Sequence, residues 1–260
     1  MKKNIKIYVI ALAVSVLFGY GVTNYIHINQ NSTQQKNKEI QTVNSTPLKG
    51  FSICIDPGHG KVSKPNKKTE PIAPGVEIQK AAIASGTMGV ATGVSEASLN
   101  LTVAKKLRKS LEQNGAKVVM VRETEECDLT NVERAEFWNS AKVDLTIRIH
   151  GNGTNDSSVS GVLMMIPGNK YIKDTELLEN SRKAGELVLA GVIDYTKAKS
   201  RGIQETSELT GFNWSKVPVI LLEMGFMTNP EEDKLLNTEE YQNKMVTGIT
   251  EGLIKYVKEK

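Results

Sequence analysis

The chain has 260 residues, of which 39% are hydrophobic and 24% charged, a balance that excludes a disordered polyampholyte and predicts a globular core. Two cysteines are too few for a disulfide scaffold or an all-cysteine zinc site, and 5% aromatic residues do not favour a base-stacking surface. The net charge of +4 comes from the first 50 residues, which hold six lysines and one glutamate. The rest of the chain is close to neutral, so we expect no nucleic acid as a partner.

The N-terminal region is expected to direct the chain out of the cytoplasm. Residues 1–6 form a basic n-region that stays in the cytoplasm, and residues 7–23 are mostly apolar. This segment fits a signal anchor or a signal peptide, and the absence of a clear cleavage site favours the anchor. Residues 24–49 are rich in Asn, Gln, Ser and Thr, which predicts a flexible linker before a folded domain at 50–260.

Apolar runs and helical periodicity alternate along the folded domain. Short apolar runs predict strands at 51–55, 117–122, 143–149, 161–166 and 217–222. Capping patterns and apolar spacing predict helices that begin near residues 95, 130, 174, 230 and 239. Residues 61–94 lack a clear period and are predicted to form a long ordered loop. The pattern indicates a single α/β domain with a mixed, mostly parallel sheet flanked by helices on both faces, preceded by an N-terminal hydrophobic helix and a stalk.

Three polar residues lie where predicted strands end. His59 follows the first strand, and His150 and Glu223 end two later ones. Because ligands bind beyond the carboxyl ends of strands in open α/β sheets, we expect the three side chains to meet at one edge. Imidazole and carboxylate suit Zn²⁺, and a catalytic zinc commonly has three protein ligands. By residue type alone, the candidates for a third ligand are Glu70, Glu77, Glu96 and Glu223.

Helix position favours Glu96 as the third ligand, because the first turn of a helix aims a side chain rigidly. Glu223 then remains available as a base. Ordinary interpretations stay open, since isolated histidines are more often not ligands and acidic residues favour helix N-termini. A carboxylate at Glu223, directly after an apolar strand, is harder to explain without a partner or a function.

Motifs spread over residues 51–257 carry a family resemblance. They are Ile-Asp-Pro-Gly-His-Gly at 55–60, Glu96 followed by Asn100 and Leu101, Gly-Ala-Lys-Val-Val at 115–119, Arg134, Asp-Leu-Thr-Ile-Arg-Ile-His at 144–150, and Pro-Val-Ile-Leu-Leu-Glu-Met-Gly-Phe-Met-Thr-Asn-Pro at 218–230. With them the chain resembles the zinc-dependent N-acetylmuramoyl-L-alanine amidases. The resemblance implies one Zn²⁺ per domain, with His59, Glu96 and His150 as ligands and Glu223 as the catalytic base and acid.

The resemblance also implies an activity and a location. The expected reaction is hydrolysis of the amide bond between N-acetylmuramic acid and the L-alanine of the peptidoglycan stem peptide. Peptidoglycan is then the expected partner, with the domain anchored in the membrane through residues 7–23 or secreted to the cell wall. Two alternatives are a catalytically inactive peptidoglycan-binding protein on the same fold and another zinc hydrolase of the wall, such as a peptidase or deacetylase.

Two further residues are candidates for substrate binding. Arg148 departs from many family members, which have a small polar residue there, and strand alternation places it on the same face as His150. It is expected either to contact the substrate or to pair with an acid. Asn100 lies one turn beyond Glu96, so it is expected to touch the substrate or to lie on the helix surface. The length of the 61–94 loop is a second departure.

Asp56 and Arg134 are expected to have structural roles. Asp56 precedes Pro-Gly, which favours a turn, while an alternative makes it an acceptor that orients His59. Arg134 is expected to form a buried salt bridge.

Overall fold

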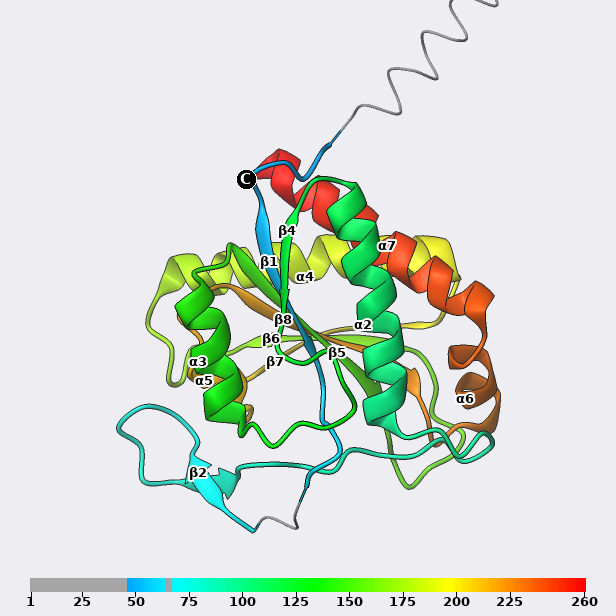
Figure 1. Ribbon diagram of the computed structural model, residues 1–260, viewed down its shortest axis with the longest axis horizontal. Helices are drawn as coiled ribbons and strands as arrows, with labels where there is room; N and C mark the ends of the chain where they lie inside the picture. Colours follow the sequence, from blue (N-terminus) through cyan, green and yellow to red (C-terminus); the bar gives the residue numbers. More distant parts are fainter. Residues whose placement is uncertain (1–45, 64–66) are drawn as a thin grey trace, which may run out of the picture. The chain divides into compact units, whose positions relative to one another are not determined.

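Six strands spread along the chain form one central sheet (Figure 1). A computed structural model describes residues 46–63 and 67–260, which belong to one compact unit. The order of strands in the sheet is β4-β1-β5-β8-β6-β7. The strands are β1 (Ser52–Pro57), β4 (Lys117–Met120), β5 (Leu145–Asn152), β6 (Val162–Pro167), β7 (Ser200–Thr206) and β8 (Val219–Phe226).

The strand directions bring several strand ends to one edge of the sheet. β4, β1, β5 and β8 are parallel neighbours, whereas β6 runs antiparallel to β8 and β7 is parallel to β6. The sheet is therefore mixed and mostly parallel, as the sequence predicts. The carboxyl ends of β1, β5 and β8 lie side by side, which is where open α/β sheets bind ligands.

Helices cover both faces of the sheet, because successive apolar side chains of β1 point to opposite faces and each face needs a cover. Ile53 and Ile55 join the core shared with α2, α4 and α7, whereas Cys54 between them packs in a second cluster with Trp138 of α3. A third cluster on this second face includes Phe212 of α5. The helices are α2 (Glu96–Gln113), α3 (Asn131–Ala141), α4 (Thr175–Thr196), α5 (Thr210–Asn213), α6 (Pro230–Leu236) and α7 (Glu239–Glu259).

The predicted strands and helices are confirmed to within a few residues, but some elements were not predicted. β7 is a polar strand at the sheet edge, so no apolar run marks it. α5 is a single short turn of helix. The 61–94 segment is largely irregular as expected, but it contains a hairpin of β2 (Thr69–Pro71) and β3 (Gln79–Ala81). Three-residue strands are too short for a period of two to be visible.

The predicted segments 1–6 and 7–23, and all but the last residues of the linker 24–49, lie outside the residues that the structure describes. Within residues 46–63 and 67–260, no helix combines the length and apolar character needed to cross a bilayer.

Asp56 is fully buried within β1 and forms two salt bridges. Its Oδ1 accepts a hydrogen bond from Arg134 Nη1 at 2.6 Å, and its Oδ2 accepts one from Arg148 Nε at 2.8 Å. Both sequence interpretations of Asp56 are therefore wrong, since it lies in a strand and the His59 ring bonds to other groups. The salt-bridge prediction for Arg134 is confirmed. The carboxylate ties β1 to its neighbour β5 and to α3.

The environment of Asp56 keeps it ionised. Burial alone would raise the pKa of Asp56, but the charges of Arg134 and Arg148 outweigh burial and hold this pKa well below its ordinary value. Removing the acid leaves two buried guanidinium groups without their shared partner, which is a costly arrangement.

We predict that Asp56→Asn lowers the free energy of unfolding by about 3–5 kcal/mol, because it breaks a buried ion-pair network from one side. Urea unfolding measures the change. The matched control is Asp194→Asn, whose ion pair with Lys197 is largely exposed, and for which we expect a change below about 0.5 kcal/mol. Equal effects of the two substitutions would contradict a structural role for the Asp56 cluster.

Candidate metal and catalytic site

Four side chains from distant segments meet near the carboxyl ends of the central strands, and β5 and β8 continue two and three residues past His150 and Glu223. His150 and Glu223 are register partners on the adjacent strands β5 and β8. His59 follows the end of β1 by two residues, and Glu96 is the first residue of α2. The structure therefore brings the three predicted ligands and the predicted base to one place.

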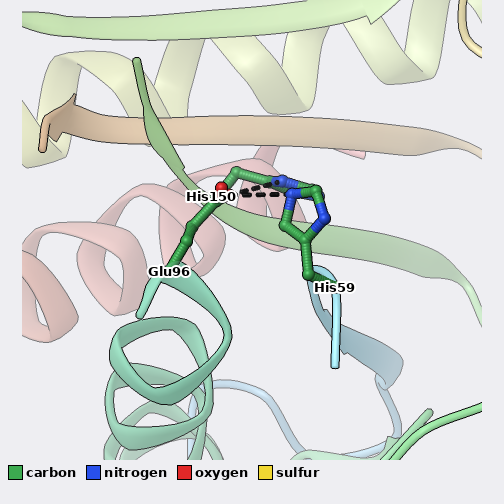
Figure 2. A group of neighbouring side chains, drawn as sticks. All are labelled: His59, Glu96 and His150. Carbon is green, nitrogen blue, oxygen red and sulfur yellow. Dashed lines mark hydrogen bonds and ion pairs between the residues drawn. The ribbon is translucent and has the colours of Figure 1, made fainter. Parts of the chain in front are cut away.

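The carboxylate of Glu96 lies against both imidazole rings (Figure 2). Glu96 Oε1 is 3.0 Å from His59 Nε2 and 3.1 Å from His150 Nδ1. One potential ligand atom from each residue lies within 4.8 Å of the other two. Donor atoms that share one tetrahedral zinc ion, each about 2.1 Å from it, are roughly 3.4 Å apart. The composition and spacing of the three side chains thus fit a zinc ion.

The two histidine rings differ in what surrounds them. His59 Nδ1 is 2.8 Å from the carbonyl oxygen of Ala84, which can only accept a hydrogen bond, so Nδ1 donates there and Nε2 faces Glu96. His150 Nε2 is buried without a hydrogen-bond partner among the described residues. Burial lowers the pKa of His150 to about 4, which keeps the ring neutral at pH 7, the form that binds metals.

Main-chain groups fix the orientation of the Glu96 carboxylate. Its Oε2 accepts a hydrogen bond from the Thr87 N–H at 2.9 Å, and its Oε1 accepts one from the Gly151 N–H at 3.2 Å. Burial opposes ionisation of Glu96, but hydrogen bonds to His150 and His59 outweigh it and hold the pKa of Glu96 well below its ordinary value. Glu96 therefore stays anionic, as a metal ligand must.

Asn100 differs from both roles expected for it. Its side chain is fully buried, and Nδ2 donates to Glu96 Oε1 and to the Gly58 carbonyl oxygen, each at 3.3 Å. A buried amide is neither on the helix surface nor within reach of a substrate. Asn100 instead positions the Glu96 carboxylate from one turn further along α2.

Close packing around the cluster requires glycine at two positions. A Cβ atom on Gly58 would lie 2.2 Å from the His150 ring, and one on Gly86 would lie 2.9 Å from both Glu96 Oε2 and the His59 ring. Gly86 also has φ +77°, and His59 itself has φ +61°, which is strained for a residue with a side chain. Backbone strain and close contact are thus concentrated at the cluster, as is common at functional sites.

Glu223 has the environment of an acid–base group. Its Oε2 is buried and has no hydrogen-bond partner in the described part of the chain. Burial, and then the charge of Glu96, raise the pKa of Glu223 to about 8, although Arg148 opposes the shift. A carboxyl group with such a pKa exchanges a proton near neutral pH, which suits general acid–base chemistry.

Two cavities open beside the cluster, and both have His59, His150 and Glu223 in their walls. The first has a volume of about 400 Å³ and the second about 380 Å³. Arg148 pairs with Asp56, which is one of the two alternatives that the sequence left open, and it also lines the second cavity.

Sequence reasoning missed the groups that support the site. Ala84 and Thr87 act through main-chain atoms of the 61–94 segment, and residue type does not reveal a backbone donor or acceptor. It also missed residues 152–155, which line the first cavity. The sequence offered a signal for these residues, because Asn, Gly and Thr, which are typical of loops, are concentrated directly after His150.

Comparison with protein families gives a match over most of the chain. Residues 53–255 match the family model described as N-acetylmuramoyl-L-alanine amidase. This range contains all four residues of the site.

Individual proteins agree with the family match. The chain is 27% identical over 210 residues to the Bacillus subtilis N-acetylmuramoyl-L-alanine amidase LytC. That alignment covers 81% of this chain but only 36% of LytC. The chain is 28% identical over 240 residues to the germination-specific N-acetylmuramoyl-L-alanine amidase of the same species, with 83% and 84% covered. A crystal structure of an N-acetylmuramoyl-L-alanine amidase from Clostridium difficile 630 aligns with a TM-score of 0.65 at 28% identity, covering 81% of this chain and 98% of that one.

The raised pKa of Glu223 predicts how the stability of the metal-free protein depends on pH. The folded protein keeps this proton up to about pH 8, whereas the unfolded chain loses it near 4.5, so Glu223 lowers stability as the pH rises through this window. Glu223→Gln cannot ionise. After chelation, we expect the variant to gain at least about 1 kcal/mol over the unchanged protein between pH 5 and pH 9, or roughly 2–4 °C in Tm.

Thermal unfolding of both proteins across this pH range measures the effect. The comparison isolates Glu223, because all other titrating groups are shared. Parallel profiles of Tm against pH would contradict the raised pKa.

Proposed function

The chain belongs to the N-acetylmuramoyl-L-alanine amidase family and to that enzyme class, and from this premise we propose a reaction and a cofactor. The proposed reaction is zinc-dependent hydrolysis of the amide bond between N-acetylmuramic acid and the L-alanine of the peptidoglycan stem peptide. The single observation that carries the proposal is the convergence of His59, Glu96 and His150, with ligand atoms within 4.8 Å of one another, beside Glu223.

The donor set favours zinc among the common metals. Two imidazoles and one carboxylate suit Zn²⁺, whereas Ca²⁺ and Mg²⁺ prefer shells made of oxygen atoms. Three protein ligands also match a catalytic zinc site, which keeps one position for water or substrate. When bound, the ion would polarise the scissile carbonyl and lower the pKa of a bound water to about 7.

We propose that Glu223 moves the proton in this reaction. Its carboxylate takes a proton from the attacking water and later delivers it to the amine of the departing peptide. The free Oε2 and the pKa of about 8 support this role, because no competing hydrogen bond holds that oxygen in the described chain. A neighbouring cation would lower this pKa and favour the base form at the start of the reaction.

The remaining site residues receive separate roles. Arg148 is proposed to bind the substrate from the wall of the second cavity. Asn100, which the sequence made a candidate for the same task, is proposed to hold Glu96 in place, since it is buried and bonded to that carboxylate.

We infer that the domain at 50–260 acts outside the cytoplasm. The family is named for the bond between N-acetylmuramic acid and L-alanine, which occurs in peptidoglycan. In addition, the basic residues 1–6 are followed by the apolar residues 7–23, a pattern typical of export. In this arrangement residues 24–49 link the domain to an anchor, or the domain is released into the wall.

We predict that Glu223→Gln lowers kcat for release of stem peptides from purified peptidoglycan by about 10²- to 10⁴-fold while one zinc per chain is retained. His59→Ala should lose the metal as well as the activity, and a chelator should abolish hydrolysis by the unchanged enzyme. Mass spectrometry of the fragments and metal analysis of the protein measure these results. The control Glu77→Gln makes the same chemical change at an exposed glutamate and should keep full activity.

The products distinguish the other functions considered for this chain. An amidase leaves an intact lactyl group and an intact peptide, whereas a peptidase or deacetylase gives other fragments. Tight binding to the wall without soluble fragments would indicate an inactive binding protein. Full activity of Glu223→Gln would overturn the assignment of the base.

A further inference from the structure

The two cavities beside Glu223 divide the site into two halves of different chemistry. Apart from the shared His59, His150 and Glu223, the first cavity contains Glu96 and otherwise only uncharged residues. These uncharged residues are Gly86, Thr87, Gly151, Asn152, Gly153, Thr154, Asn155 and Thr228. The second cavity contains charged side chains of its own, namely Lys80, Arg148 and Glu208.

The two cations of the second cavity differ in what they already bind. Lys80 Nζ is 2.8 Å from Glu208 Oε2, in a pair whose side chains are 39% and 62% exposed. The Arg148 side chain is only 6% exposed and donates from Nε to Asp56. Its two terminal nitrogens have no hydrogen-bond acceptor within the described residues.

The structure holds this guanidinium group in a defined position in the wall of the second cavity. Arg148 Cζ lies 6.0 Å from the centre of the Trp138 ring. Gly211 passes so close that a Cβ atom there would be 3.1 Å from Arg148 Nη1. Nε, the ring and the glycine together fix the plane of the group, and its terminal N–H groups are left for a ligand in the cavity.

The charge around Arg148 favours an anion. Asp56 is the only acid bonded to Arg148 in the described chain, and it is shared with Arg134, so two buried guanidinium groups have one carboxylate between them. Buried cations are normally matched by acids, and an arginine presents its terminal nitrogens to a carboxylate as a planar fork. A carboxylate in the second cavity would complete the pairing.

The position of Arg148 along β5 indicates where on a substrate that carboxylate lies. Arg148 is two residues before His150 on the same face of the strand, which separates their Cα atoms by about 6.6 Å. Two residues of an extended peptide span about the same length. A carboxylate on the second residue beyond the scissile amide would therefore meet Arg148 while the amide lies beside His150 and Glu223.

We propose that Arg148 selects stem peptides that have a free carboxylate on their second residue, and that the first cavity takes the muramic acid. This inference rests on the proposed amidase function. It makes Arg148 a specificity-determining residue, and it predicts that amidation of that carboxylate protects peptidoglycan from this enzyme.

The test uses the zinc-loaded full-length protein and two synthetic muramoyl tripeptides that differ only by a carboxylate or a carboxamide on the second residue. Chromatography of the released tripeptide gives kcat/KM for each. We expect the carboxylate substrate to be preferred by at least about tenfold, because a charge-assisted hydrogen bond to arginine is lost with the amide. Arg148→Gln should reduce this ratio to near one, chiefly by raising KM for the carboxylate substrate.

Two further variants keep the test decisive. Arg148→Lys retains the charge and a donor for Asp56 but lacks the planar fork, so it should show a reduced preference in the same direction even if Arg148→Gln fails to fold. Lys80→Gln removes a positive charge from the same cavity and should leave the ratio within about twofold, since Lys80 is paired with Glu208.

Each outcome has one meaning. Equal cleavage of the two substrates by the unchanged enzyme would overturn the role of Arg148 and leave the amidase function intact. Loss of the preference in Lys80→Gln, or its persistence in Arg148→Gln, would also overturn the assignment. Cleavage of neither substrate would reject the proposed function, and with it the specificity that rests on it.

Discussion

The site depends on the two salt bridges of one buried carboxylate, Asp56. It fixes Arg148 in β5, the strand that also contains His150, and it fixes Arg134 in α3. Arg134 also donates from Nη2 to the carbonyl oxygen of His59, so the cluster reaches the residue with the strained backbone. Arg122 adds hydrogen bonds to the carbonyl groups of Pro57 and Gly58, at 3.0 Å each. The strained turn that presents His59 is therefore held by arginines, and a flexible loop would not keep the imidazole in place.

The irregular segment that precedes α2 is part of the site and not only a connection. Its Ala84 carbonyl and Thr87 N–H bond to the two side chains that sequence reasoning assigned as ligands, His59 and Glu96. Asp233 of α6 in turn accepts hydrogen bonds from the main-chain N–H groups of Ala91 and Thr92, which fasten the same segment further along. Groups that orient metal ligands matter almost as much as the ligands, because they set the tautomer and the direction of each lone pair.

Sequence patterns predicted the parts of this molecule that depend on burial and chain direction. The apolar runs of β1, β5 and β8 are long enough to be recognised, and the rule for strand ends then places His59, His150 and Glu223 together. Asp56 was misjudged because Asp-Pro-Gly favours turns locally, whereas the two distant arginines that hold it in a strand leave no local signal. Asn100 was misjudged because helical spacing gives the face of a residue but not what covers that face. The mostly exposed strand β7 lacks the burial on which the predictions rest.

Two carboxylates a short distance apart have opposite protonation behaviour in this site, and their surroundings explain why. Glu96 is buried, yet it accepts hydrogen bonds from two main-chain N–H groups and lies against two imidazoles, so its charge is stabilised. Glu223 has a buried Oε2 beside Glu96 without comparable donors, so its charge is destabilised by both burial and its neighbour. Pairs of acids whose pKa values are pushed apart are typical of sites that need one fixed anion and one group that exchanges a proton. The roles proposed for the two glutamates thus agree with their hydrogen-bond donors, which α2, its preceding segment and β5 supply to Glu96 and not to Glu223.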